Sequence, residues 1–129
     1  MTQSTIAIDV TLDDQKIPHQ ILWNASQSSS EEKQDAKAIM ISFWDGKERA
    51  ALRIDLWTKE MMVDEMADFY YQTMMTMADT FDRATHQTAL VGEMKDFATQ
   101  FYNKFKKTMQ EQQQGWLLDI EEEVEPAEF

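Results

Sequence analysis

The sequence has no cysteine and few of the residues that interrupt regular structure. It contains three glycines, two prolines and two histidines in 129 residues. The lack of cysteine excludes disulfide bonds and thiol chemistry. The three glycines, Gly46, Gly92 and Gly115, lie too far apart to form a glycine-rich phosphate loop. Neither His19 nor His86 has a second histidine three to five residues away, so we expect no metal site and no cofactor.

Long apolar runs and basic residues are also scarce. No run approaches the roughly 18 to 20 apolar residues that span a bilayer, and the start lacks the pattern of a signal peptide. We therefore expect a soluble, cytoplasmic protein without membrane insertion. Twelve basic residues stand against 24 acidic ones, a net charge of −12. Nucleic acid binding needs clustered Lys or Arg, and the one cluster, at 104–107, suits the C-terminal end of a helix, so no nucleic acid partner is expected.

The N-terminal part of the chain alternates apolar and polar residues in the manner of β-strands. The stretches "TIAIDVTL" and "IPHQILWN" are separated by the polar residues "DDQK", which predicts a hairpin. In the predicted register Ile8 lies opposite Ile21, and His19 shares their inner face. Pro18 cannot donate to a strand ladder, which fits an edge or near-edge position for the second strand.

A second hairpin is predicted between "AIMISFW" and "AALRIDLW". Asp45 and Gly46 form a strong signal for a two-residue turn, and that turn would place Ile39 opposite Leu52. The serine-rich segment 25–37 between the two hairpins is expected to be a loop with at most a short helical turn.

The second half of the chain has helical periodicity. Residues 62–84 carry an apolar stripe with acidic residues mostly outside it, and a second amphipathic run continues to Met109. We expect a single α+β domain over residues 1–109 and an acidic, flexible tail over residues 110–129. The first stripe consists of Met62, Met66, Phe69, Thr73, Met77, Phe81 and Ala84, widened by Tyr70 and Met74.

Geometry indicates how these elements would assemble. Four strands about 4.8 Å apart make a sheet roughly 14 to 19 Å wide, and two helices packed about 10 Å apart cover that width once. The predicted fold is therefore a four-stranded antiparallel sheet of two hairpins, with one face covered by two C-terminal amphipathic helices. The other face would be solvated or covered by another chain. That outer face would carry Trp44, Trp57, Met40 and Leu22 among Arg53, Asp55, Asp9 and Gln20.

Carboxylates are abundant, but their spacing does not indicate catalysis. General acid–base chemistry needs carboxylates held in a pocket that displaces their pKa values. Asp64 and Asp68 lie one turn apart on an outward helix face and are expected to be solvated. Arg53 and Asp55 lie on one side of one strand, where an ion pair is expected. We therefore predict no catalytic residues and no enzymatic activity.

Two sets of large apolar residues are candidates for protein contacts. Trp44 and Trp57 would form an aromatic patch with a polar rim on the outer sheet face, which is typical of an interface. The alternative is that sheet twist or a loop covers them. In the tail, Trp116, Leu117 and Leu118 could anchor a docking segment, and the alternative there is disorder kept soluble by charge.

Several long motifs resemble the gliding-motility protein GldC family. They include "LRIDLWTKEM", "VDEM" and "MADTFDRAT", all within residues 36–85, and "DFATQFYNKF" fits the second helix. The likeness covers about residues 4–107. It implies a non-enzymatic cytoplasmic accessory of the gliding apparatus or its associated secretion system, and it supplies no catalytic residues.

Three functions remain open at this point. The first is an interaction module that binds a protein partner, or a second copy as a homodimer, through the outer sheet face. The second is a holdase chaperone similar to SecB, on fold-level analogy alone. The third is a small-ligand carrier with a cleft between sheet and helices, to which the inner face would contribute chiefly His19.

Overall fold

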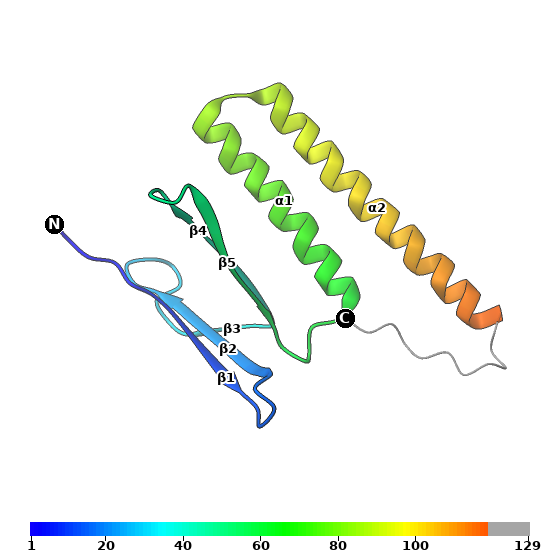
Figure 1. Cartoon of the computed structure of the whole chain (residues 1–129), viewed down its shortest axis with the longest axis horizontal. Coiled ribbons are helices and arrows are strands. Elements are labelled where there is room, and N and C mark those ends of the chain that lie inside the picture. The colour runs from blue at the N-terminus through cyan, green and yellow to red at the C-terminus, as the bar shows by residue number, and fades with distance from the viewer. Residues whose placement is uncertain (119–129) are drawn as a thin grey trace. The chain divides into compact units, whose positions relative to one another are not determined.

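The computed structural model describes residues 1–118 and divides the chain into two compact units. The β unit comprises residues 1–62, and the helical unit begins at Val63. Five strands and two helices follow one another along the chain (Figure 1). The α+β class, the antiparallel pairing and the two C-terminal helices are thus confirmed. The predictions that the helices cover one sheet face and that residues 110–129 form a separate tail stay predictions.

The first sheet has three antiparallel strands in the order β1-β2-β3. Ile21 in the middle strand lies opposite Val10 on one side and Ala36 on the other. Its side chain is 0% exposed, which makes it the centre of this sheet's apolar packing. The strands are β1 (Ile6–Leu12), β2 (Pro18–Ala25) and β3 (Gln34–Ala36).

The predicted register of the first hairpin is wrong by two residues. Ile21 pairs with Val10 rather than with Ile8, and the ladder shifts again between Thr11 and Leu12. The reason lies in the turn, where one Asp13 carboxylate oxygen accepts hydrogen bonds from the backbone N–H groups of residues 15 and 17. Because the shift is even, the apolar residues keep the face that the alternation predicts.

Of the edge and near-edge positions expected for the second strand, the structure has the near-edge one. β3 pairs with the open side of β2, so β2 is the central strand. Pro18 is tolerated because it is the first residue of β2, where a missing donor costs little. β3 lies inside the segment expected to be a loop, and the rest of that segment forms turns rather than a helical turn.

The second sheet consists of β4 (Ala38–Asp45) and β5 (Ala50–Trp57). The predicted two-residue turn is wrong, because Asp45 pairs with Ala50 across a four-residue connection. The Asp45 carboxylate accepts hydrogen bonds from the N–H groups of Lys47 and Glu48, and Arg49 has a φ of 53°. This turn chemistry shifts Ile39 from Leu52 to Leu56 and preserves the faces.

The prediction of one continuous four-stranded sheet is wrong. The β3 and β4 strands are separated by Lys37 alone, yet β3 pairs with β2 whereas β4 pairs with β5. The Lys37 carbonyl accepts hydrogen bonds from the Thr58 backbone N–H at 2.8 Å and from its hydroxyl at 2.9 Å. Thr58 itself is buried. These bonds fix the point at which the chain leaves one sheet and enters the next.

The helical unit is an antiparallel pair of helices, α1 (Val63–Thr85) and α2 (Thr88–Leu118), as Figure 1 shows. Asp64 and Glu65 in the first turn of α1 suit the positive end of the helix dipole. The α2 helix extends past Met109, where the apolar periodicity fades. Alanines and a valine let the two backbones approach closely, and the buried residues are Ala67, Ala78, Val91 and Ala98.

Candidate interaction surfaces

One face of the β4–β5 sheet carries the predicted tryptophan patch. The register places Trp57 opposite Ala38 and Trp44 opposite Ala51, on the same face. Because each indole lies opposite an alanine, neither is covered from across the ladder. Trp44 is 64% exposed and Trp57 43% exposed. We call this surface the tryptophan face, and it also holds Met40, Ser42, Arg53 and Asp55.

The two charges on the tryptophan face bind each other. The guanidinium of Arg53 donates to both carboxylate oxygens of Asp55, over 2.8 Å from Nη2 and 3.2 Å from Nε. Both side chains are partly solvated, at positions two apart on one strand. The expected ion pair is therefore present, and a two-pronged arginine–carboxylate pair holds both groups in a fixed geometry.

The opposite face of the same sheet is also apolar and exposed. Phe43 and Leu52 lie opposite each other, 57% and 56% exposed, and Ile54 lies opposite Ile41. Exposed apolar side chains on both faces are unusual for a strand pair, because an antiparallel sheet normally buries one face. This sheet therefore offers two apolar surfaces, of which the sequence singled out one.

Leu22 does not belong to the tryptophan face. It lies in β2, opposite Asp9 on one side and Asp35 on the other, and its sheet is the three-stranded one. Lys33 forms an ion pair with Asp9 at 3.4 Å beside it. The prediction of one outer face that joins Leu22 and Gln20 to Trp44 and Trp57 fails because the sheet is divided at Lys37.

The predicted tail anchors Trp116, Leu117 and Leu118 occupy the end of α2. Their side chains, and all of residues 119–129, lie outside the part of the chain that the structure describes. A docking role for these three residues therefore stays a prediction.

Two polar side-chain contacts join α1 and α2, one in each half of α1. The Tyr102 hydroxyl donates to the Asp68 carboxylate, while the Tyr102 ring stacks on Tyr71 with centroids 4.9 Å apart. Lys106 lies over the outer side of that ring. The bond to Asp68 raises the pKa of Tyr102 above its ordinary value. Asp68, expected to be solvated, is thus a structural partner, and sequence reasoning missed it because Tyr102 lies on another helix.

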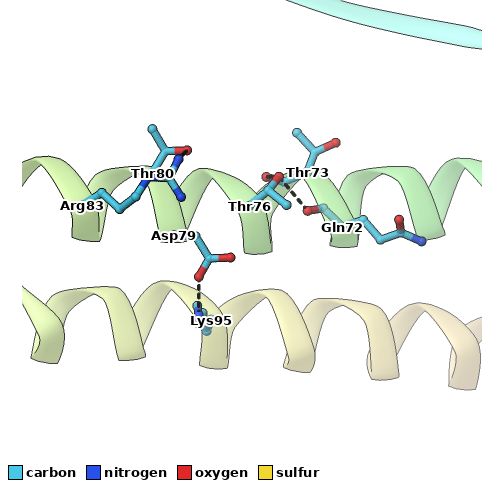
Figure 2. A network of polar contacts seen from close by, with 7 residues as sticks. All are labelled: Gln72, Thr73, Thr76, Asp79, Thr80, Arg83 and Lys95. Atoms are coloured by element: carbon cyan, nitrogen blue, oxygen red, sulfur yellow. Dashed lines mark hydrogen bonds and ion pairs between the residues drawn. The ribbon is translucent and has the colours of Figure 1, made fainter. Parts of the chain in front are cut away.

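The second contact lies nearer the turn between the helices. Lys95 on α2 reaches Asp79 on α1 at 2.6 Å (Figure 2), and this bond raises the pKa of Lys95. On α1 itself, the Thr76 hydroxyl donates to backbone carbonyls of its own helix, and Arg83 donates to Thr80. The Asp79–Lys95 contact joins the two helices, whereas the Thr76 and Arg83 contacts lie within α1.

An apolar groove of about 620 Å³ runs along the helix pair beside the Asp79–Lys95 bond. Further exposed apolar side chains on α2 are Leu90, Phe97 and Phe101, with the two phenylalanine rings stacked. The methionine-rich stripe of α1 predicted this apolar surface, although as buried core. The groove is lined by Thr76, Met77, Thr80, Phe81, Ala84 and Met94.

A second pocket, of about 510 Å³, lies in the β unit where the chain passes between the two sheets. His19 lines it, but this pocket lies within the β unit, whereas the ligand-carrier hypothesis places its cleft between sheet and helices. The other lining groups are mostly polar or charged. Within residues 1–118 no group of three or more histidines and carboxylates is placed to hold a metal ion. The lining residues are His19, Gln20, Asp35, Ala36, Lys37, Thr58 and Glu60.

A helix that crosses a bilayer must be both long and apolar. Neither α1 nor the described part of α2 combines the length and apolar character that a bilayer crossing requires.

The fold and its exposed faces define a small α+β protein with apolar side chains exposed on its surface. Comparison with known families places it further: residues 18–107 match the model of the GldC-like gliding motility-associated proteins. The chain belongs to this GldC-like family, as the motifs in residues 36–85 indicate. No curated protein and no solved structure matches the chain significantly.

Proposed function

We propose that this protein is a non-enzymatic, cytoplasmic interaction module of the gliding apparatus or its associated secretion system. Its docking surface is the tryptophan face, which binds a protein partner. The observation that carries the proposal is the exposure of two indoles, Trp44 and Trp57, on one face of a sheet with a fixed ion pair between them. Membership of a gliding motility-associated family supports the setting.

The chemistry of this face suits a protein surface better than a small molecule. Tryptophan is enriched among the residues that dominate binding energy, and such residues work best when a polar rim excludes water around them. Arg53 and Asp55 supply that rim between the two indoles, and Ser42 lies opposite Arg53. A partner that covers both indoles would desolvate a large apolar area and still meet charged groups that select its orientation.

The experiment replaces both indoles, as Trp44→Ser with Trp57→Ser, in a gliding strain that lacks the native gene. We expect loss of spreading and loss of association with the apparatus, while circular dichroism shows an intact fold. The matched control is Phe43→Ser with Leu52→Ser, which removes equally exposed apolar residues from the opposite face. A double tryptophan variant that still spreads and still associates contradicts the proposal.

A holdase chaperone is the second candidate, because the helix pair offers an extended apolar groove. Flexible methionine side chains such as Met77 and Met94 accommodate unfolded segments of varied shape. A holdase would suppress aggregation of a denatured client enzyme, and Met77→Ser with Phe81→Ser would abolish that effect. Suppression that survives these changes, or no suppression by the native chain, removes this candidate.

A further inference from the structure

The β5 strand presents an open edge. It pairs with β4 along one side, and no other strand within residues 1–118 pairs with its second side. The direction of its backbone groups follows from Thr58, whose N–H donates to the Lys37 carbonyl in the same register as the ladder. Because this direction alternates along an antiparallel strand, the backbone groups of Ile54 and of every second residue from it face β4. The N–H and C=O groups of Arg53, Asp55 and Trp57 therefore face the open edge.

This edge lacks several of the devices that protect edges in monomeric proteins, and its two charges, Arg53 and Asp55, neutralise each other in an ion pair. Natural edge strands are short, bulged, or interrupted by proline or lysine. β5 is eight residues long, has a continuous register with β4, and contains neither proline nor lysine. A two-stranded sheet is also marginal by itself, since a third strand or a packed helix is needed for independent stability. Both features indicate that the edge is occupied when the protein functions.

We propose that the β5 edge pairs with the β5 edge of a second copy of this chain, antiparallel and centred on Ile54. The two copies then share one four-stranded sheet in the order β4-β5-β5-β4. The occupant is a second copy because the sequence of β5 complements itself in this arrangement. Such a contact uses the same residues on both subunits, as a twofold dimer requires.

Charge selects the register. Backbone groups that face the edge must oppose one another, so Arg53 can lie opposite Arg53, Asp55, Trp57 or Ala51 of the second copy. The first choice sets like charges against each other, and the third sets Asp55 against Asp55. Only the register centred on Ile54 places Arg53 opposite Asp55 in both directions, which gives two ion pairs across the new ladder.

The remaining residues agree with that register. Leu52 lies opposite Leu56 of the second copy on the apolar face, where Ile54 meets its own equivalent. On the tryptophan face Trp57 lies opposite Ala51, so a large side chain meets a small one. The pairing enlarges the tryptophan face but does not depend on that face as a docking surface, because it is made by backbone groups at the edge.

Cross-linking of the full chain tests the geometry. The protein has no cysteine, so Ile54→Cys introduces a single thiol. At the centre of the pairing the two Cα atoms lie about 4.5 Å apart, within disulfide range. The matched control is Ile41→Cys, on the same face one strand away. Two Ile41 positions would be separated by about 14 Å, three strand spacings, which no disulfide spans.

We expect mild oxidation to convert most of the Ile54→Cys variant, and almost none of the Ile41→Cys variant, into a covalent dimer. Light scattering of the native chain at 100 µM should give twice the 15.1 kDa of one chain. A native mass of one chain, or equal cross-linking at both positions, overturns the proposal.

A charge exchange tests the register and separates this proposal from the docking function. Arg53→Asp and Asp55→Arg, each alone, should raise the dimer dissociation constant at least about tenfold through like-charge contacts. A mixture of the two variants should form a heterodimer, and the chain carrying both changes should dimerise again. Variants that stay monomeric when mixed overturn the register. Trp44→Ser, away from the edge, should leave the native mass unchanged while it weakens partner docking.

Discussion

Both sheets of the β unit contain eight-residue strands, and they differ in what those strands bury. β2, β4 and β5 each have eight residues. In β2, Ile21 is 0% exposed and lies between Val10 and Ala36 of the flanking strands. In the β4–β5 sheet no residue of either strand is buried. The apolar content is not the cause, since β5 alone contains two leucines, an isoleucine and a tryptophan.

The two sheets differ in the number of strand neighbours, because β2 has one on each side whereas β4 and β5 have one each. A central strand loses water on both edges, whereas each strand of a pair keeps one edge and both faces open. The three-stranded sheet can therefore support itself around Ile21, whereas β4 and β5 still have apolar area to bury. That unburied area, on both faces and at the β5 edge, is where we place function.

The largest expected effect comes from the centre of the better-packed sheet. Ile21→Ala should lower the free energy of unfolding by about 2 to 5 kcal/mol, because a fully buried isoleucine loses its contacts and leaves a cavity. Ile54→Ala, half exposed in β5, should cost less than about 1 kcal/mol in the single chain. Urea denaturation at a concentration where light scattering gives one chain measures both. Equal costs would abolish the distinction between the sheets.

A smaller effect is expected at the junction of the two sheets. Thr58→Val removes the hydroxyl that donates to the Lys37 carbonyl but keeps the backbone bond to the same oxygen. The loss should be about 1 kcal/mol, the usual net worth of one hydrogen bond. Thr58→Ser keeps the hydroxyl and serves as the control. If serine destabilises the protein and valine does not, the methyl group rather than the hydroxyl holds the junction.

The faces of the strands and the two helices could be predicted from the sequence because both follow local periodicity. Alternation in "LRIDLW" assigns Trp57 and Arg53 to one face whatever the exact pairing, since a register error of two or four residues leaves faces unchanged. The tryptophan face, as far as it lies on β4 and β5, was therefore predictable. The family assignment was predictable too, because long motifs carry it.

The registers and the division of the sheet could not be predicted, because single side-chain contacts decide them. Asp13 and Asp45 bind backbone N–H groups inside their turns and set the loop lengths. β3 consists of Gln34–Ala36, a polar segment that forms a strand because β2 offers it an edge. Thr58 reaches Lys37 across 21 residues of sequence, and no local pattern reports such a contact.

The smallest predicted effect concerns the ion pair that links the β1–β2 turn to the residue after Thr58. Asp13 binds Lys59 at 2.6 Å, and this bond, with the hydrogen bond from the Ile17 N–H, lowers the pKa of Asp13 from 3.8 to about 2. A carboxylate with a lowered folded-state pKa stabilises the protein above its unfolded-state pKa. That stabilisation is lost as the pH falls from about 4 to about 2.

Asp13→Asn should therefore reduce the loss of stability on the acid side, measured as the urea midpoint between pH 5 and pH 2. Between pH 6 and pH 8 the slope of the urea midpoint against pH should change little. Asp14→Asn removes the same charge one residue further along and should leave the native slope between pH 4 and pH 2. If both variants flatten the profile alike, the net charge of the turn and not the Asp13–Lys59 contact is responsible. A steeper acid loss in Asp13→Asn than in the native chain would contradict the direction of the pKa shift itself, because removing a group with a lowered pKa can only reduce proton uptake on unfolding.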